Sequence, residues 1–216
     1  MKRIIGTRAP KRKGEERKRL ILESAQTVFA NSNYAKVGTA DLARAAGISE
    51  PALYRYFSGK KDLYRSTLKM AGARLLEIWQ QVGRASKNPL DVLWTLGLGY
   101  YDHLQNRSPV LKLFFEALSE TRDPDIRATV RENFRGMVGF IEKSLQEGRA
   151  RGHVRSDIDL RTAAWHFMAI GLAFDLIHVL GLDGELDRKK VEAWGRLYLD
   201  SIGAKPWNPL DRTTND

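Results

Sequence analysis

The stretch from Thr39 to Phe57 constrains the fold more than any other part of the chain. Apolar or small residues recur with helical spacing on both sides of Gly47, which predicts two short helices separated by a tight turn. Ala43, four residues before Gly47, leaves room for the second helix to cross the first, and Gly47 suits the positive φ of such a turn. The pattern therefore predicts a helix-turn-helix motif.

The start of the second helix is marked by residues that suit a helix N-terminus. Ser49 is a good N-cap, and Pro51 falls in the first turn, where no backbone hydrogen bond is lost. Leu53 then faces the core and Arg55 faces solvent. Helical corners of this kind also occur in domains that bind no nucleic acid, so the spacing alone leaves a purely structural role open.

The charge of the chain favours nucleic-acid binding because it is concentrated around this motif. The 216 residues carry a formal net charge of +10, from 36 basic and 26 acidic side chains. Residues 1–63 hold 14 of the basic and 6 of the acidic side chains, so they supply +8 of this charge. A localised basic patch attracts phosphate, whereas the mixed remainder is typical of solvated surface.

The first third of the chain also resembles the DNA-binding domain of TetR-type transcriptional regulators. The resemblance rests on the Ala-x-x-x-Gly turn, on Leu-Tyr-x-x-Phe and on Lys-x-x-Leu, which here are Ala43 to Gly47, Leu53 to Phe57 and Lys60 to Leu63. It implies a homodimeric, cytoplasmic bacterial regulator, a repressor that binds an inverted-repeat DNA operator. In this family a small-molecule effector shifts the protein toward a state that releases the operator.

Placing the second helix in the major groove gives its residues separate expected roles. Pro51 and Ala52 would contact thymine methyl groups, and Arg55 would reach a guanine or a phosphate. By resemblance, phosphate contacts come from Tyr54, Tyr56, Lys60 and Thr39, although Tyr56 could instead pack on the first helix. The complete expected DNA-binding set is Thr39, Ser49, Glu50, Pro51, Ala52, Tyr54, Arg55, Tyr56 and Lys60.

Two residues depart from the family pattern. Gly38 stands where the first helix of the motif usually opens with Thr or Ser, so the cap must come from the Gly38 backbone or from Thr39, with Asp41 favourable nearby. Glu50 brings a carboxylate to a position where a cationic or amide residue is common. Glu50 either accepts a hydrogen bond from a cytosine amino group or caps the helix toward solvent, and base reading is the favoured interpretation.

The remaining chain shows helical periodicity without strand alternation, so the predicted fold class is all-α. We expect a flexible basic arm over residues 1–14, a helix-turn-helix domain over 15–61, a helical effector-binding and dimerisation domain over 62–204, and a loosely attached tail over 205–216. Basic residues of the arm either touch DNA or stay solvated; they are Arg8, Lys11, Arg12 and Lys13.

The segment from Leu160 to Leu180 is apolar around nearly its whole circumference, which predicts burial on several sides at once. Asp175 and His166 argue against a membrane span, and the absence of a signal peptide predicts a soluble protein. By resemblance, the helices at about 160–180 and 186–202 pair with their copies in a second subunit. The alternative is that both complete the core of a monomer.

Aromatic residues on the middle helices, together with the resemblance, imply a cavity for a small apolar or aromatic effector. The same residues are also what an ordinary helical core contains. The expected lining set is Tyr101, His103, Phe114, Met137, Phe140, Trp165, Met168 and His178.

No motif in the sequence indicates an enzyme. The chain has no cysteine, its four histidines lack the spacing of a catalytic metal site, and no phosphate-binding loop is present. We therefore expect no catalytic residue, no metal and no cofactor. Two other functions remain open: a non-specific architectural nucleic-acid binder, and a helical small-molecule carrier or enzyme in which the corner is structural.

Overall fold

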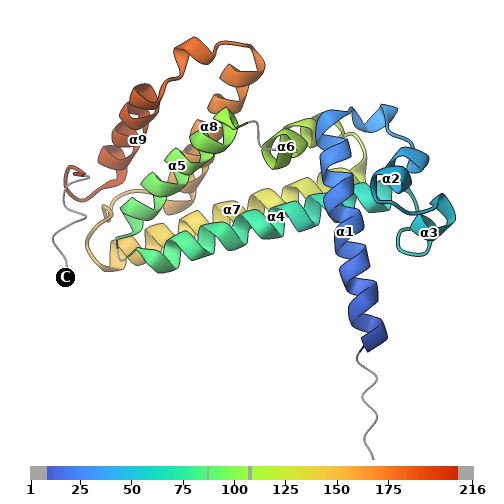
Figure 1. The fold of residues 1–216 in the computed structure, drawn as a ribbon. Helices are drawn as coiled ribbons and strands as arrows, with labels where there is room; N and C mark the ends of the chain where they lie inside the picture. The colour runs from blue at the N-terminus through green and yellow to red at the C-terminus, as the bar shows by residue number, and fades with distance from the viewer. Residues whose placement is uncertain (1–8, 87, 107–108, 209–216) are drawn as a thin grey trace, which may run out of the picture. The chain divides into compact units, whose positions relative to one another are not determined.

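The computed structural model describes residues 9–86, 88–106 and 109–208, and these residues form nine α-helices (Figure 1). They are α1 (Ala9–Asn31), α2 (Thr39–Ala45), α3 (Glu50–Tyr54), α4 (Lys60–Ala85), α5 (Pro89–Gln105), α6 (Pro109–Ser119), α7 (Pro124–Ala150), α8 (Leu160–Val179) and α9 (Arg188–Ile202). Within the described ranges, the strand-like pairing is one isolated antiparallel bridge, between Val154 and Gly203. The prediction of an all-α fold is confirmed.

Helix starts follow the capping residues of the sequence. Side chains that accept a hydrogen bond from a backbone N–H of the first turn begin α3, α5, α8 and α9; they are Ser49, Asn88, Asp159 and Asp187. At the start of α2, Gly38 has no side chain to offer, and the Asp41 carboxylate accepts the Gly38 N–H at 3.2 Å instead. This contact fixes the position where α2 begins.

The chain divides into two compact units, and the first joins the residues up to Gly72 with residues 112–130. Its core lies where α1, α2 and the first half of α4 meet. Ile21, Phe29, Leu42 and Tyr64 are each at most 1% exposed, and the Tyr64 ring packs edge-on against Phe29 with 4.7 Å between centroids. These contacts support the helix-turn-helix motif from behind.

Ion pairs explain why the start of α7 belongs to this first unit. Lys61 Nζ lies 3.2 Å from an Asp123 carboxylate oxygen and 3.0 Å from one of Asp125. Arg65 Nε donates to the Thr129 hydroxyl at 3.3 Å. The expected boundary after residue 61 therefore differs from the structure, where the division falls at Gly72, inside α4, and residues 112–130 join the motif.

The second unit contains the second half of α4, α5, most of α7, α8 and α9. Its core is aliphatic, and Leu93, Val138, Ile141, Leu145 and Leu199 are each at most 1% exposed. Within this core, the Tyr198 hydroxyl of α9 donates to the backbone carbonyl of Ala163 in α8 at 2.9 Å. Helices α8 and α9, which are predicted to form a subunit interface, thus contribute to one core with α5 and α7.

The segment after α9 is held more firmly than expected. Trp207 is only 8% exposed, and its ring centroid lies 4.5 Å from that of Trp94. Its indole N–H donates to Asp91 at 3.1 Å and its backbone N–H donates to Asp200 at 2.8 Å. Residues up to Trp207 are therefore part of the second unit, while residues 209–216 of the expected tail lie outside the described residues.

The expected basic arm also needs a correction. Helix α1 begins at Ala9, so residues 9–14 of the segment predicted to be an arm are helical. Pro10 lies in the first turn of α1, where its missing N–H costs no helical hydrogen bond. Residues 1–8, which include Arg8, lie outside the described residues.

Helix α8 has the length and apolar composition of a membrane-spanning helix, but only 22% of its apolar window is buried in the single chain. Core helices of soluble proteins pass the same test of length and composition. Several of its large apolar residues are exposed, among them Trp165 and Leu176 at 45% and 52%. The expectation that this helix is buried on several sides is therefore not met within one chain.

Candidate nucleic-acid interface

The turn between α2 and α3 has the geometry that the sequence predicts. Gly47 has a φ of 62°, in the left-handed region that favours glycine. The Ile48 N–H donates to the Ala43 carbonyl at 3.0 Å, which closes the turn. Ala43 is 2% exposed, so a larger side chain at this position would force α2 and α3 apart.

Helix α3 has one buried and one exposed face. Ala52 and Leu53 are 9% and 2% exposed and belong to the core of the first unit. Pro51, Tyr54 and Arg55 are exposed. Ala52 therefore faces the core, and the expected contact of its methyl group with thymine is not supported. The exposed residues remain available for DNA, as does Ser49, whose hydroxyl oxygen also caps the helix by accepting the Ala52 N–H.

Thr39 and Glu50 form a contact that the sequence did not predict. The Thr39 hydroxyl donates a hydrogen bond to the Glu50 carboxylate, joining the first residue of α2 to the first residue of α3. Both side chains are half-buried. The carboxylate thereby braces the two helices, and it can contact a base only through the acceptor capacity that the Thr39 hydroxyl leaves free.

Lys60 and Tyr56 lie at the edge of the exposed face. Lys60 Nζ donates to the Tyr34 carbonyl at 3.1 Å and lies 4.5 Å from the centroid of the Tyr34 ring. Tyr56 is half-buried, which fits packing on the motif as well as a phosphate contact. Tyr34 itself packs against Phe29 and Tyr64, so Lys60 is held at a fixed place near the motif.

Two other cations near the motif, Arg44 and Lys61, pair with carboxylates. Arg44 pairs with Asp41 at 3.0 Å on the exposed side of α2. Hydrogen bonds with Asp125 and Asp123 raise the pKa of Lys61, because its charged form is paired with these carboxylates at the start of α7. Arg55 is thus distinguished as an exposed cation at the end of α3 itself, which favours it as the residue that reaches a base or a phosphate.

Lys18 of α1 was not among the residues predicted for the site. Its Nζ lies 5.2 Å from the centroid of the Phe57 ring, just beyond the C-terminal end of α3. The signal available in the sequence was its spacing of three residues from Ile21, a residue of the core-facing stripe. Helix α1 therefore adds positive charge beside the motif.

The expected effector residues do not form a single cluster. Phe114 belongs to the first compact unit, and the other seven belong to the second. Met137 is buried in the core, whereas Trp165 is 45% exposed and His103 is also exposed. Tyr101, Met168 and His178 are half-buried, and His178 Nδ1 lies 2.8 Å from Asp183. Phe140 is the member of the set that lines a described pocket.

That pocket has a volume of about 520 Å³ and lies between α4, the start of α5 and α7. Leu76, Val92 and Phe140 supply apolar lining, and the exposed Arg84, Lys143 and Glu147 also line the pocket. A second, largely apolar pocket between α5, α8 and α9 holds about 30 Å³, which is room for about one water molecule. A third pocket, of about 760 Å³, is lined by residues around the start of α5, Arg151 and Trp207. The 520 Å³ pocket is the one of these three that contains a residue of the expected effector set, Phe140, so it is the better candidate for a small-molecule site.

A buried polar pair between α5 and α8 was also not predicted. The Tyr100 hydroxyl donates to the Asp175 carboxylate at 2.6 Å, and Asp175 is 8% exposed. Burial raises the pKa of Asp175 to about 6, although the Tyr100 hydrogen bond and the charge of His178 act in the opposite direction. Burial likewise raises the pKa of Tyr100, so Tyr100 stays protonated as the donor.

The geometry of α2 and α3 defines a class of protein. A tight glycine turn, a capped second helix with an exposed Arg and Tyr, and a basic surround together make a helix-turn-helix DNA-binding protein. Two family models match: residues 21–67 match the bacterial regulatory proteins of the tetR family, and residues 109–189 match the tetracyclin repressor-like C-terminal domain. The chain belongs to the TetR family of transcriptional regulators.

The individual proteins to which the chain is similar are also transcriptional regulators. The chain is 29% identical over 126 residues to the transcriptional activator FasR of Mycolicibacterium smegmatis, covering 58% of this chain and 56% of that protein. It is 27% identical over 143 residues to the repressor KstR2 of the same organism, covering 65% and 68%. A solved TetR transcriptional regulator from Chloroflexus aurantiacus has the same fold, with a TM-score of 0.74, 21% identity, and coverage of 89% and 98%.

Proposed function

We propose that this protein is a sequence-specific regulator of transcription in the bacterial cytoplasm, a repressor that binds an inverted-repeat operator and releases it when a small effector binds. The observation that carries the proposal is the exposed face of α3, where Pro51, Tyr54 and Arg55 reach solvent beside a closed glycine turn. Helices presented in this way enter the major groove with their N-terminal residues against base edges.

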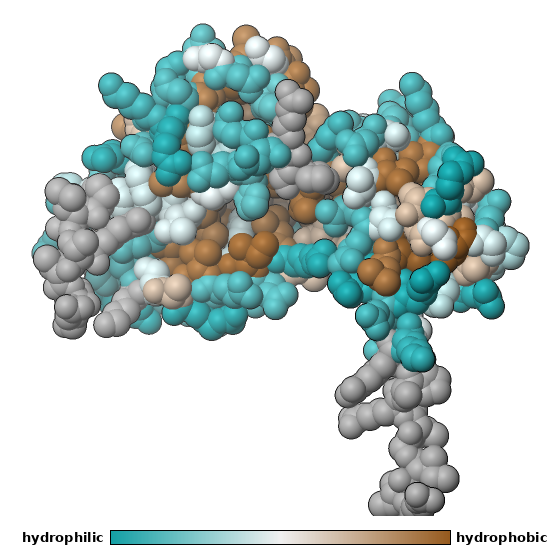
Figure 2. Space-filling model, in the orientation of Figure 1, coloured by the Kyte–Doolittle hydropathy of each residue, from teal (hydrophilic) through white to brown (hydrophobic). Residues whose placement is uncertain are grey.

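A second copy of the chain is the proposed partner of α8 and α9. Large apolar residues remain exposed on both helices, including Leu176 at 52% and Leu197 at 72%. In Figure 2, hydrophobic surface is also visible around the turn between α8 and α9, where Leu180 and Leu182 are 61% and 47% exposed. Patches of this kind mark protein interfaces, and a two-fold dimer would match the symmetry of an inverted repeat.

The proposed effector is a small apolar or aromatic molecule that occupies the 520 Å³ pocket. Phe140 and Leu76 can contact the apolar part of the effector. The exposed Arg84 and Lys143 can pair with a single anionic group of the effector. The effector shifts the protein away from the DNA-binding state only to the extent that it binds the other state more tightly.

The test of sequence-specific binding compares two kinds of variant in equilibrium binding to a panel of duplexes. We expect Arg55→Ala to weaken discrimination at particular base pairs, by about 1–3 kcal/mol if Arg55 contacts a guanine. Tyr54→Phe combined with Lys60→Ala should weaken binding to all sequences and lower its dependence on salt.

If Arg55→Ala weakens binding to all duplexes equally, Arg55 contacts a phosphate rather than a base. Equal binding of the native chain to every duplex would overturn the proposal and favour a non-specific architectural binder.

A further inference from the structure

We propose that the first three turns of α1 form a second DNA-binding element, which lies along the phosphate backbone beside the groove occupied by α3. The inference rests on the proposed binding of duplex DNA and extends it to a surface outside the helix-turn-helix motif. Its occupant is the sugar-phosphate backbone, so the element contributes affinity without reading sequence.

The first observation is that the side chains described in this part of α1 are largely exposed. Lys13 and residues 15–20 are all exposed, and Ile21 is the first fully buried residue among the side chains of α1 that the structure describes. At about 1.5 Å per residue, residues 9–20 extend α1 by roughly 18 Å. Figure 1 shows this end of α1 continuing past α2 and α3, which belong to the same compact unit.

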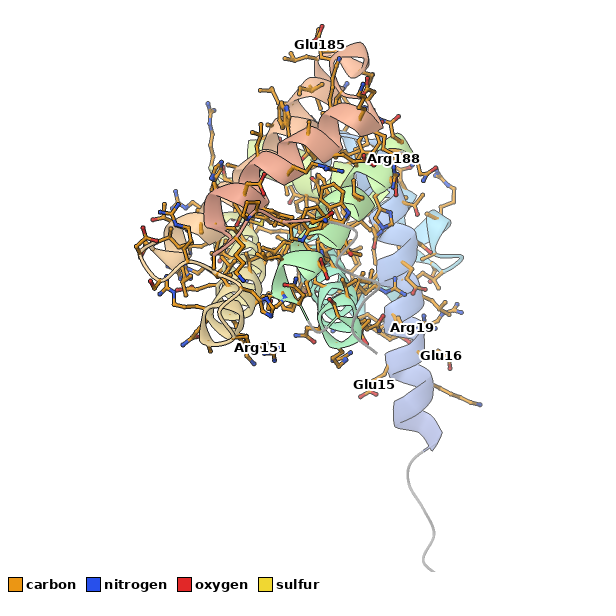
Figure 3. All side chains as sticks on the ribbon, turned by 90° about the vertical axis from the view of Figure 1, so that its left-hand side faces the viewer. Glu15, Glu16, Arg19, Arg151, Glu185 and Arg188 are labelled. Carbon is orange, nitrogen blue, oxygen red and sulfur yellow. The ribbon has the colours of Figure 1, made fainter. Side chains whose placement is uncertain are left out.

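The second observation is that charge is segregated around the helix. Arg17 and Lys18 lie four and three residues before Ile21, so the helix register places them on the face that packs on the motif further along. Lys13 continues that row four residues before Arg17. Glu15 and Glu16 point to the two flanks, as Figure 3 shows, so the face shared with Ile21 carries cations without acids.

The third observation connects this cationic face to the recognition helix. Lys18 Nζ sits 5.2 Å from the centroid of Phe57, two residues beyond Arg55, the C-cap of α3. DNA bound to α3 would therefore contact Lys18 first. Arg17 and Lys13 would contact it further along the same face of α1. The contact places the exposed Lys18 near the C-terminal end of α3, and the positive charge of Lys18 is complementary to phosphate.

Helix energetics point to the same partner. A helical end whose described side chains are mostly exposed is marginally stable in water, and Gly14 and the row of like charges weaken it further. Phosphates along the cationic face would remove the repulsion between Lys13, Arg17 and Lys18. Binding of DNA is therefore expected to slow hydrogen exchange in residues 9–20, beyond the protection that this segment has in the free protein.

The experiment uses the full chain and two matched single variants, Arg17→Gln and Arg19→Gln. Both remove one positive charge from the exposed part of α1, but Arg19 lies on the outer face and pairs with Glu23 at 2.9 Å. Binding to a duplex of random sequence is measured from low to moderate salt. The slope of log K against log salt is negative, and we expect Arg17→Gln to reduce its magnitude by about 0.9 for each phosphate that is no longer neutralised. Arg19→Gln should leave the slope near the native value.

Equal changes in both variants would overturn the proposal in favour of diffuse attraction by net charge, and no change in either would overturn it by showing that the segment stays solvated. Because the probe has a random sequence, these outcomes are independent of whether an operator exists. Lys13→Gln combined with Arg17→Gln should double the effect, and hydrogen exchange of residues 9–20 that is unaffected by DNA would also contradict the proposal. All substituted residues are exposed, so loss of the fold does not confuse the comparison.

Discussion

The hydrogen bond between Thr39 and Glu50 changes the role in DNA binding that is expected of each residue. The family pattern assigns a phosphate contact to the hydroxyl, and the sequence alone favours base reading by the carboxylate. The structure joins them across the turn, so each limits what the other can offer to DNA. Glu50 as a base reader stays a prediction, whereas its role in holding α2 against α3 follows from the contact.

A double-mutant cycle with Thr39→Val and Glu50→Ala measures this brace. Each single change should cost about 1 kcal/mol of stability, and the double variant should cost less than the sum by about 0.5–1.5 kcal/mol. The readout is urea unfolding of the full chain followed by circular dichroism. Additive losses would mean that the two side chains do not interact in solution.

Asp175 predicts a pH dependence of stability. Its pKa is raised from 3.8 to about 6 by burial, so the folded protein binds this proton more tightly than the unfolded chain. The resulting stabilisation is fully present below about pH 4 and is lost as the pH rises through about 6, with a total of about 3 kcal/mol.

The matched variant is Asp175→Asn, which keeps the shape and an acceptor for Tyr100 but cannot titrate. Urea unfolding between pH 4 and 7 should show the native chain losing stability relative to this variant as the pH rises. Two parallel stability curves would contradict the raised pKa.

Individual elements differ in how far the sequence could predict them. Ser49, Pro51 and Gly47 act through local backbone chemistry, so the turn and the start of α3 follow from their order. The start of α1 was misplaced because Pro10 and Gly14 are helix breakers in most contexts, yet the first turn of a helix tolerates proline. Local sequence rules therefore predict best those features whose interacting groups lie within a few residues of one another.

The segment after α9 illustrates the opposite case. Trp207 is fixed by Trp94 and Asp91, residues more than a hundred positions earlier, so no local pattern could reveal its burial. Likewise, an aromatic stripe does not distinguish a cavity from a core, which is why the expected effector residues are scattered and only Phe140 lines a described pocket. The burial of Trp207 and the presence of a cavity both depend on contacts between residues that are far apart in the sequence.

Removing the Trp207 side chain tests this anchor. Trp207→Ala should lower the free energy of unfolding by roughly 3–5 kcal/mol, because it empties a buried ring site and leaves the Asp91 carboxylate without the indole donor. Lys205→Ala, an exposed change in the same segment, should stay within about 0.5 kcal/mol of the native value. A thermal melt of Trp207→Ala that matches the native chain would show that the segment is only loosely attached.

At the scale of the whole molecule, the proposed DNA-binding surface belongs to one compact unit and the proposed effector pocket to the other. Gly139 lines that pocket on α7, and a side chain added there meets no atom within 4 Å. Gly99 on α5 is equally open but is not among the residues lining the described pockets. The two glycines therefore allow the same substitution inside and outside the proposed effector site.

Gly139→Leu should fill the pocket and leave DNA binding intact while abolishing the release of DNA by small apolar and aromatic carboxylates. Gly99→Leu should respond to the same compounds like the native chain. Fluorescence anisotropy of a labelled duplex measures release in each case. If both variants still release DNA, the effector binds elsewhere.

The central claim is sequence-specific binding of DNA by a dimer, and selection of fragmented bacterial genomic DNA on the purified protein near physiological salt tests it most directly. The proposed function predicts that sequencing of the retained fragments reveals an inverted repeat with half-sites about one helical turn apart. Retention without an enriched sequence, or no retention at all, would contradict it.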